Sequence, residues 1–221
     1  MNSVGDAFTY PFKDPQWLSK IAVQGLILII PIVGWIATAG WLMLTFDNLR
    51  AGRQELAPAG FHLERGIGIF GVVVIYAIVI NIPAWILDGI GGSMNSAMSH
   101  HNGLVYSPIS ALGSLWSFVA QLFLDFLMPS LIVLTARGGF SGGLDVSRVW
   151  ALATSQVNNS VIGGAVIFAA GIVGGLGLIA CCIGVFFTIT YAAAVHAGVA
   201  AWFERVQTTP AAPAAPGTPA A

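Results

Sequence analysis

Residues 161–203, VIGGAVIFAAGIVGGLGLIACCIGVFFTITYAAAVHAGVAAWF, contain no Asp, Glu, Lys or Arg. A helix that crosses the ~30 Å hydrocarbon core of a bilayer needs about 20 apolar residues. This stretch of more than 40 residues is long enough for two crossings, and we expect it to turn near residues 181–184. It predicts an integral membrane protein with a helical hairpin over these residues.

The composition of the whole chain agrees with this prediction. Of its 221 residues, 57% are hydrophobic and 8% are charged, whereas soluble domains contain about 25% charged residues. Only helices and closed barrels satisfy their backbone hydrogen bonds in lipid, and the long apolar runs favour helices. A net charge of −1 offers no basic face for phosphates. The composition thus excludes nucleic acid as a partner, and the lipid bilayer is the expected one.

The rest of the chain contains further apolar segments. Residues 66–87 and 109–136 are each long enough for one crossing. Residues 17–49 would form one helix ~50 Å long, well beyond the bilayer core, so we expect a bend at residues 31–34, PIVG. The sequence leaves open whether the resulting hairpin spans the bilayer or is re-entrant. The predicted fold is an all-α, polytopic transmembrane helical bundle of six apolar segments with two hairpins.

Two regions of the chain are expected outside the helices. Residues 88–108, DGIGGSMNSAMSHHNGLVYSP, are rich in Gly, Ser and Asn, which is typical of a loop. Residues 206–221 are rich in Pro and Ala and have little to bury, so a disordered tail is expected there. Residues 1–205 are then a single transmembrane domain.

The basic residues indicate the orientation of the chain. Lys and Arg are costly to translocate and remain on the cytoplasmic side. Six crossings place all eight of them on one face, so we expect both termini to be cytoplasmic. Because they are scattered along the sequence, we expect no polybasic cluster for anionic lipids. The eight residues are Lys13, Lys20, Arg50, Arg53, Arg65, Arg137, Arg148 and Arg205.

Two tryptophans are candidate anchors at the membrane interface. Residues 144–152, LDVSRVWAL, place apolar side chains at helical spacing, which predicts an amphipathic helix with Trp150 at headgroup depth. Trp17 follows Asp14 and Pro15, a typical helix start, and aromatic residues precede it. We expect Trp17 in the interfacial aromatic belt.

A few polar residues lie within the predicted crossings. Asp125 is the strongest candidate, because a carboxylate in a membrane normally faces other protein groups or a cavity. Gln121 lies one turn away on the same helix face, and counting residues along the helices places His196 and Tyr76 at a similar depth. These four residues form a candidate polar layer, with a direct Asp125–His196 pair as a hypothesis. Its role is either to fix helix packing or to respond to protons or cations.

Small residues recur four apart in the last two helices. Gly171 and Gly175 form one such pair, and Ala193, Ala197 and Ala201 form a longer row. Such faces let helices approach closely in lipid. The neighbouring helix belongs either to this chain or to another subunit, and the sequence leaves both open.

Two segments of the chain also resemble each other. Residues 25–34 align with residues 175–184, and Thr38 then aligns with Thr188. Apolar sequences match easily by chance, so an internal repeat is left open.

The N-terminal segments carry a family resemblance. Residues 10–17, YPFKDPQW, lead into an apolar arm, followed by PIVG at residues 31–34 and NLRAG at residues 48–52. This pattern resembles the domain of unknown function 4013 family, small membrane proteins of prokaryotes, over roughly residues 5–205. The resemblance implies a multi-helix fold in a prokaryotic inner (plasma) membrane and supplies no activity or site residue.

The sequence contains no enzyme motif. We find no nucleophile elbow, no glycine loop leading to Lys and no metal-spaced His pair, so no catalytic residue, cofactor or metal is expected. We expect a non-enzymatic structural or accessory subunit that associates with other membrane proteins, or with itself, through its small-residue faces. The alternative is a small permease or proton-coupled carrier around Asp125, since transporters often contain repeats and broken helices.

Overall fold

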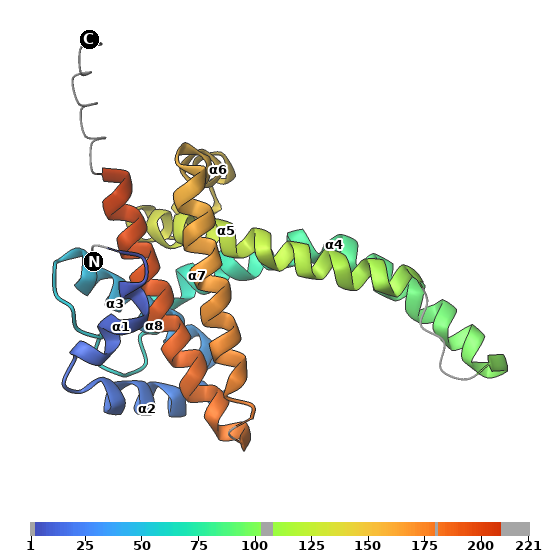
Figure 1. The fold of residues 1–221 in the computed structure, drawn as a ribbon, viewed down its shortest axis with the longest axis horizontal. Helices are drawn as coiled ribbons and strands as arrows, with labels where there is room; N and C mark the ends of the chain where they lie inside the picture. The colour runs from blue at the N-terminus through green and yellow to red at the C-terminus, as the bar shows by residue number, and fades with distance from the viewer. Residues whose placement is uncertain (1–2, 103–107, 180, 209–221) are drawn as a thin grey trace, which may run out of the picture.

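The computed structural model of the protein describes residues 3–102, 108–179 and 181–208. Every regular element in these ranges is helical, in agreement with the predicted fold class (Figure 1). In chain order they are α1 (Asp6–Thr9), the 3-10 helix η1 (Tyr10–Lys13), α2 (Trp17–Leu28), α3 (Val33–Arg50), α4 (Leu63–Asn102), α5 (Pro108–Leu144), α6 (Val146–Ser155), α7 (Val157–Leu176) and α8 (Cys181–Thr208).

Four segments are long and apolar enough to cross a membrane: Leu63–Met94 of α4, α5, α7, and Ile183–Thr208 of α8. The chain is therefore a membrane protein of apolar helices. The sequence predicts six crossings; α3 is not among these four segments, and neither is α2. Helix α2 has 12 residues, which gives a helix of ~18 Å against a bilayer core of ~30 Å. A re-entrant first hairpin stays a prediction.

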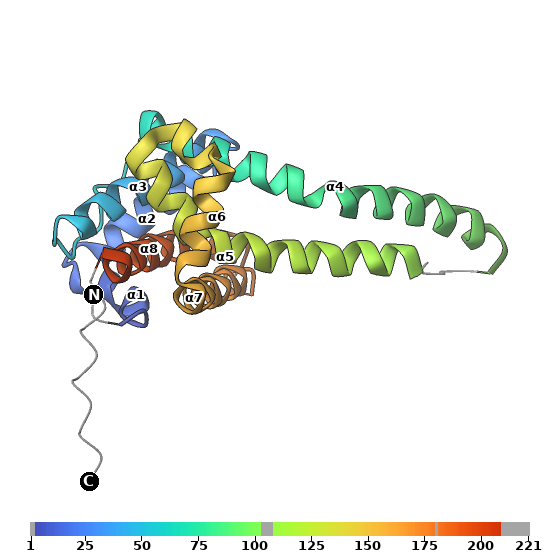
Figure 2. The same ribbon diagram turned by 90° about the horizontal axis from the view of Figure 1, so that it is seen from above.

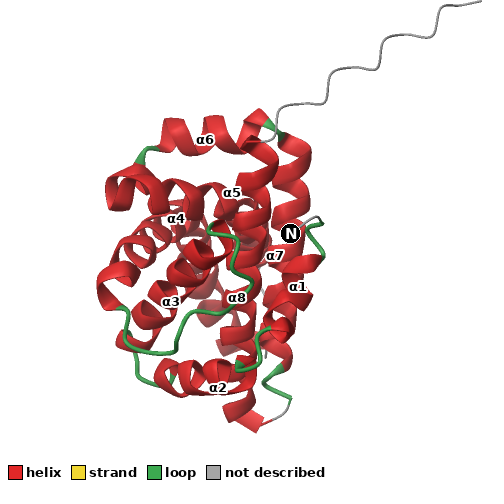
Figure 3. Ribbon diagram, turned by 90° about the vertical axis from the view of Figure 1, so that its left-hand side faces the viewer, coloured by secondary structure: helices red, strands yellow, loops and turns green. Residues whose placement is uncertain are grey.

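Helices α4 and α5 form a long arm that extends away from the rest of the molecule (Figure 2). Only their inner halves pack into the body, through residues such as Val72 and Leu131. Farther out they contact each other, and Trp116 Nε1 of α5 donates a hydrogen bond to the Ile80 carbonyl of α4 at 2.9 Å. The arm runs across the direction of α7 and α8 (Figures 1 and 3). This differs from a bundle in which all segments run side by side.

The loop predicted for residues 88–108 is wrong over most of its length, because α4 stays helical to Asn102. Two of its serines donate hydrogen bonds within the helix: Ser93 to the Ile90 carbonyl at 2.7 Å, and Ser96 to the Gly92 carbonyl at 3.0 Å. This Gly- and Ser-rich segment is thus helical, and α4 packs against α5 along one side. Residues 103–107 lie outside the described residues.

The predicted break in the first apolar stretch is confirmed. Helix α2 ends at Leu28 and α3 begins at Val33, with Pro31 between them. Proline lacks a backbone N–H and its ring clashes with the preceding turn, so it interrupts a helix. Gly34 lets the two arms meet, since a Cβ there would lie 2.8 Å from the Leu28 Cα.

Helices α3 and α4 cross in backbone contact at two glycines that face each other. A Cβ at Gly40 would overlap the His62 carbonyl oxygen, and a Cβ at Gly66 would overlap the Ile36 carbonyl oxygen. Neither backbone oxygen can rotate away as a side chain would. Glycine is therefore required at both positions for the first turns of α4 to pack against α3.

The N-terminal segment is fixed to α8 by two tyrosines, one buried and one partly buried. Tyr10 is fully buried and donates its hydroxyl to the Ala194 carbonyl at 2.7 Å. Tyr191 of α8 donates to the Phe8 carbonyl at the same distance of 2.7 Å. Gly198 leaves room for this contact, because a Cβ there would lie 2.8 Å from the Tyr10 ring. This packing explains the conspicuous aromatic pattern before α2.

Asp14 joins three segments at the start of α2. Its carboxylate accepts hydrogen bonds from Lys20 Nζ at 2.7 Å, from the Gln16 backbone N–H at 2.8 Å and from the Leu56 backbone N–H at 3.0 Å. Burial alone would raise the pKa of Asp14, but these donors and the Lys20 charge together lower it. The N-cap residue of α2 is Gln16 and not Asp14. Asp14 instead holds the loop between α3 and α4 through the Leu56 N–H.

The two aligned segments occupy equivalent positions in the structure. Each covers the end of one helix and the start of the next, α2 to α3 and α7 to α8. Gln24 Nε2 donates to Thr38 Oγ1 at 3.3 Å across the first break, and Thr188 Oγ1 donates to the Gly174 carbonyl at 2.7 Å across the second. Both residues of the second pair are numbered 150 higher than those of the first. This correspondence supports an internal repeat.

The C-terminal hairpin turns earlier than predicted. Helix α7 ends at Leu176 and α8 begins at Cys181, so the turn precedes residues 181–184. A Cβ at Gly177 would lie 2.6 Å from the Val185 Cα, and glycine thus permits the tight return. Helix α8 continues to Thr208, past the predicted boundary at residue 205. The remainder of the predicted tail, residues 209–221, lies outside the described residues.

Candidate functional site

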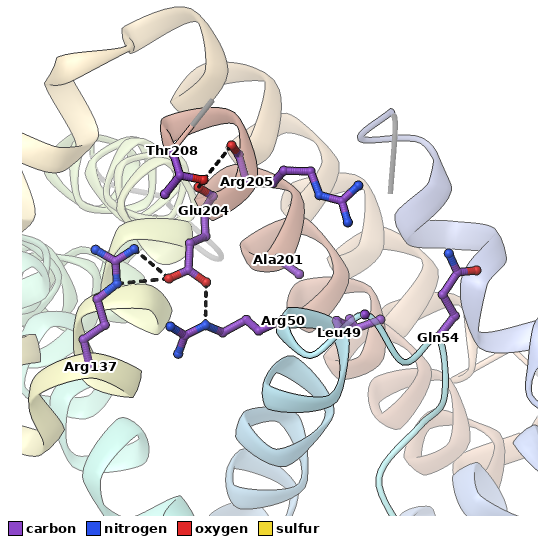
Figure 4. Close-up of a pocket in the computed structure, with 9 residues that line it drawn as sticks. Leu49, Arg50, Gln54, Arg137, Ala201, Glu204, Arg205 and Thr208 are labelled. Carbon is purple, nitrogen blue, oxygen red and sulfur yellow. Dashed lines mark hydrogen bonds and ion pairs between the residues drawn. The ribbon is translucent and has the colours of Figure 1, made fainter. Parts of the chain in front are cut away.

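Three helices bring charged residues together in one cluster (Figure 4). Arg50 is the last residue of α3, Arg137 precedes a kink in α5, and Glu204 lies in the last turns of α8. The kink is at Gly139, whose φ of 62° suits a residue without a Cβ. The helix ends thereby place two arginines around one carboxylate.

Glu204 forms short ion pairs with both arginines. Its Oε2 lies 2.7 Å from Arg50 Nε, and its Oε1 accepts hydrogen bonds from Arg137 Nε at 3.0 Å and Nη2 at 2.6 Å. The Glu204 side chain is 10% exposed, whereas the Arg50 and Arg137 side chains are 38% and 46% exposed. Such charge-assisted bonds are roughly twice as strong as neutral ones. Glu204 therefore ties α8 to the ends of α3 and α5.

A hollow of about 380 Å³ lies beside this cluster, and we call it the arginine hollow. It is lined by Leu49, Arg50, Gly52, Gln54, Arg137, Ala201, Glu204, Arg205 and Thr208. Three arginines and one glutamate give its lining a surplus of two positive charges. The sequence has no polybasic cluster, but the fold brings Arg50, Arg137 and Arg205, which are distant in sequence, to the lining of one hollow.

This cluster could not be predicted from the sequence. The available signal was Glu204, the only acidic residue after Asp145, which directly follows the charge-free residues 161–203. A carboxylate next to a long apolar segment is expected to pair with a cation. The sequence does not specify which of the scattered arginines forms that ion pair.

Within the predicted polar layer, the structure brings only Gln121 and Asp125 together. Asp125 is 5% exposed, and its Oδ1 accepts a hydrogen bond from Gln121 Nε2 at 2.9 Å. His196 hydrogen-bonds to the backbone of Ile167, and its Nε2 is buried without a partner. The Tyr76 hydroxyl is likewise unpartnered, in a separate cluster with Val149 of α6.

The direct Asp125–His196 pair is not formed. No ion pair or hydrogen bond joins the two side chains, both of which are described. Gln121 lies one helical turn away on α5, and that local partner satisfies the carboxylate without any group from α8.

The small-residue faces are only partly used inside the chain. Ala197 is fully buried in the core, and Ala193 and Ala201 pack against its edge. In contrast, a Cβ built on Gly171 or Gly175 would meet no atom within 4 Å. Helix α7 packs on α5 through Gly164 instead, where a Cβ would lie 3.0 Å from the Phe126 backbone. Of the two alternatives that the sequence leaves open, the described residues therefore show no intrachain neighbour packed at Gly171 and Gly175.

These two glycines border an apolar hollow of about 400 Å³, which we call the α7 groove. Its walls come from α3, α4, α5, α7 and α8, and His196 is the one ionisable residue among its described lining residues. Residues along it include Trp35, Thr38, Leu42, Phe70, Val73, Met128, Gly171, Gly174, Gly175, Ile189, Ala193 and His196. The faces that the sequence marks for close helix contact thus open onto a groove.

The predicted amphipathic helix is confirmed as α6. Val149 and Ala153 are its buried residues, and Asp145 caps it by accepting the Arg148 backbone N–H at 3.1 Å. Hydrogen bonds from the Ser147 hydroxyl and that N–H lower the pKa of Asp145. Trp150 is 51% exposed, and its ring centre lies 6.2 Å from that of Phe123 and 6.5 Å from that of Phe126 in α5. Trp17 packs edge-on against Phe12 with ring centres 4.8 Å apart, and the interfacial role of both tryptophans stays a prediction.

The comparison with known families agrees with the resemblance in the sequence. The profile of a family described as "Protein of unknown function (DUF4013)" matches residues 23–201. The chain belongs to this family. No curated protein and no solved structure matches the chain.

The DUF4013 match covers most of the candidate sites. It includes Arg50, Asp125, Arg137 and the α7 groove, and it ends shortly before Glu204. The aromatic motif at residues 10–17 lies outside it. Within the described residues of this DUF4013 protein, no group of three His, Cys, Asp or Glu side chains is placed to hold a metal ion.

The buried Asp125–Gln121 pair leads to a prediction about stability. Asp125→Asn keeps a carbonyl oxygen that can accept the Gln121 N–H, whereas Asp125→Leu leaves that donor without a partner. We expect the Leu variant to be about 1–2 kcal/mol less stable than the Asn variant. Thermal unfolding of both proteins in one detergent measures the difference, and equal stabilities would contradict a structural role for the bond.

Proposed function

We propose that this DUF4013 protein is a non-enzymatic structural or accessory subunit of a prokaryotic plasma membrane. In this proposal it associates with another membrane protein through the α7 groove. The observation that carries the proposal is the pair Gly171 and Gly175 at the edge of the groove, where an added Cβ would meet no atom of the described chain within 4 Å. The distribution of Lys and Arg supports a further proposal, that both termini face the cytoplasm.

The groove has the chemistry of a helix-binding surface in lipid. Transmembrane helices gain little from hydrophobic burial, so their association depends on close packing and on hydrogen bonds. Gly171 and Gly175 permit a close backbone approach, and their neighbour Ile172 is 54% exposed beside them. His196 lines the groove, and its Nε2 is buried without a hydrogen-bond partner.

Site-specific photocrosslinking in native membranes tests the groove. A photoreactive amino acid at Ile172 is expected to give one discrete protein adduct. Adding Gly175→Leu should abolish that adduct, because the new side chain fills the approach path. Gly89→Leu is the matched control: Gly89 is also a helical glycine with open space around it, but it lies on the arm. It should leave the adduct unchanged.

Three outcomes would contradict the proposal. They are adducts with lipid alone, an adduct that survives Gly175→Leu, and an adduct composed of two copies of this chain. The last would show self-association and would leave the carrier alternative in place. Because a Cβ at Gly175 meets nothing within 4 Å, the Gly175→Leu protein should elute from gel filtration in detergent like the wild type. Loss of the adduct can then be assigned to the groove.

The alternative function is a small permease or proton-coupled carrier. It is favoured by one observation, the burial of Asp125 in a candidate span with a single hydrogen-bond partner on its own helix. A carrier would require Asp125 to exchange protons or cations during transport. Proton uptake by vesicles containing the protein, lost in Asp125→Asn, would favour this alternative over the accessory subunit.

A further inference from the structure

We propose that the arginine hollow binds a phosphate group, as the headgroup of an anionic phospholipid or as part of a soluble compound. This inference is independent of the α7 groove. It rests on one hollow that Arg50, Arg137 and Arg205 line from three helices, with Glu204 as the one carboxylate among the described lining residues. In Figure 4 the guanidinium groups of Arg50 and Arg137 face Glu204, and the Arg205 side chain extends to the other side.

The hollow has more hydrogen-bond donors than its carboxylate can accept. A guanidinium group carries five N–H donors. Glu204 pairs with Nε of Arg50 and with Nε and Nη2 of Arg137. The remaining N–H groups of these two arginines have no partner in the described protein, and both side chains are more than a third exposed. An oxyanion with several acceptor oxygens would match this surplus.

Glu204 also orients the arginines before any ligand arrives. The planar guanidinium fork suits bidentate binding of a phosphate, and fixing it in advance lowers the entropy lost on binding. Arg50 is held further by the Phe46 ring, whose centre lies 5.5 Å from its Cζ. The arginines thus form a preorganised pair rather than two mobile surface charges.

The rim of the hollow adds another positive charge. Gln54 lines the hollow, and its Oε1 accepts a hydrogen bond from Lys13 Nζ at 3.1 Å. This bond occupies the amide oxygen of Gln54 and leaves its NH₂ group as the available donor. Lys13 and Gln54 therefore reinforce the preference for an anion.

Helix ends account for part of this arrangement. Arg50 and Arg205 lie in the last turns of α3 and α8, where cations are favoured by the free carbonyl groups. The same carbonyls reduce the positive potential of the hollow, so we expect moderate affinity. They do not explain why three arginines from separate helices line one space of about 380 Å³.

Binding to the full-length protein in a neutral detergent tests the inference. Native mass spectrometry would measure the affinity of phosphatidylglycerol, with phosphatidylcholine as the reference lipid, and a separate titration would use inorganic phosphate. We expect binding of phosphatidylglycerol, of inorganic phosphate, or of both, above the phosphatidylcholine level. Phosphatidylglycerol alone would identify a lipid site, and inorganic phosphate alone would identify a soluble ligand. Binding of neither would overturn the proposal.

The informative variant is Arg205→Gln, because it removes one charge and leaves both Glu204 pairs intact. We expect it to weaken binding about tenfold. Arg148→Gln is the control, since Arg148 is 74% exposed and pairs with Asp145 away from the hollow. It changes the net charge equally and should bind like the wild type. Equal affinities for the two variants would mean that binding depends only on net charge, and would overturn the proposal.

Discussion

Replacing Gly66 by alanine is expected to destabilise the protein by ~3 kcal/mol or more, at the upper end of the usual cost of overpacking. The new Cβ would overlap the Ile36 carbonyl oxygen and lie 2.8 Å from the Gly40 nitrogen. Both are backbone atoms of α3, so the clash is relieved only if α3 and α4 separate. Gly40→Ala should behave similarly, since its Cβ would overlap the His62 carbonyl oxygen. Thermal unfolding in a defined detergent measures both effects.

The control for this prediction is alanine at helical glycines with open surroundings. Gly89 and Gly171 have no atom within 4 Å of an added Cβ. At these positions alanine lowers the conformational entropy of the unfolded chain and causes no clash in the folded protein. The substitution should therefore leave the stability of the protein unchanged or raise it by about 0.5–1 kcal/mol. A loss at Gly89 or Gly171 comparable to that at Gly66 would show that helical glycines matter here for a reason other than the crossing of α3 and α4.

Features determined by neighbouring residues could be predicted from the sequence. The break between α2 and α3 follows from Pro31, whose effect on a helix is local. Helix α6 follows from the spacing of apolar residues and the capping residue Asp145. The all-helical class follows from the length of the apolar runs, because lipid allows few other solutions.

The arm could not be predicted because its helicity depends on a distant partner. The Gly and Ser content of residues 88–102 is typical of a loop. In the structure, Gly113 of α5 fits closely against the Asp88 side chain and the Ala84 carbonyl of α4. Contacts between segments that are far apart in sequence therefore override the local preference.

The spacing of small residues was an unreliable guide to which faces are covered. Gly171 and Gly175 fit the pattern and face open space, whereas Gly40 and Gly66 have no small residue four positions away and form the tightest crossing. A periodic pattern identifies a face that permits close approach, but the partner is determined by the tertiary fold. The cluster around Glu204 has the same origin, since its members come from α3, α5 and α8.

Replacing Glu204 by glutamine is expected to cost ~2–3 kcal/mol. Removing one member of a buried ion pair typically costs 3–5 kcal/mol, and the partial exposure of both arginines reduces that figure. Glutamine keeps the size of the side chain but leaves two cations facing each other without a counter-charge. The ends of α3 and α5 should then move away from α8, which protease sensitivity near Arg50 would report together with the lower unfolding temperature.

The matched control is Asp47→Asn, which removes the carboxylate of an exposed pair. Asp47 Oδ2 lies 2.9 Å from Arg65 Nη2, and the two side chains are 30% and 54% exposed. Exposed pairs contribute about 0–1 kcal/mol because solvent screens them. A cost of Glu204→Gln no greater than that of Asp47→Asn would show that Glu204 does not join the three helices. A larger cost, lessened when Arg137→Gln is added, would show that the coupling runs through this pair, because the second change removes the uncompensated charge.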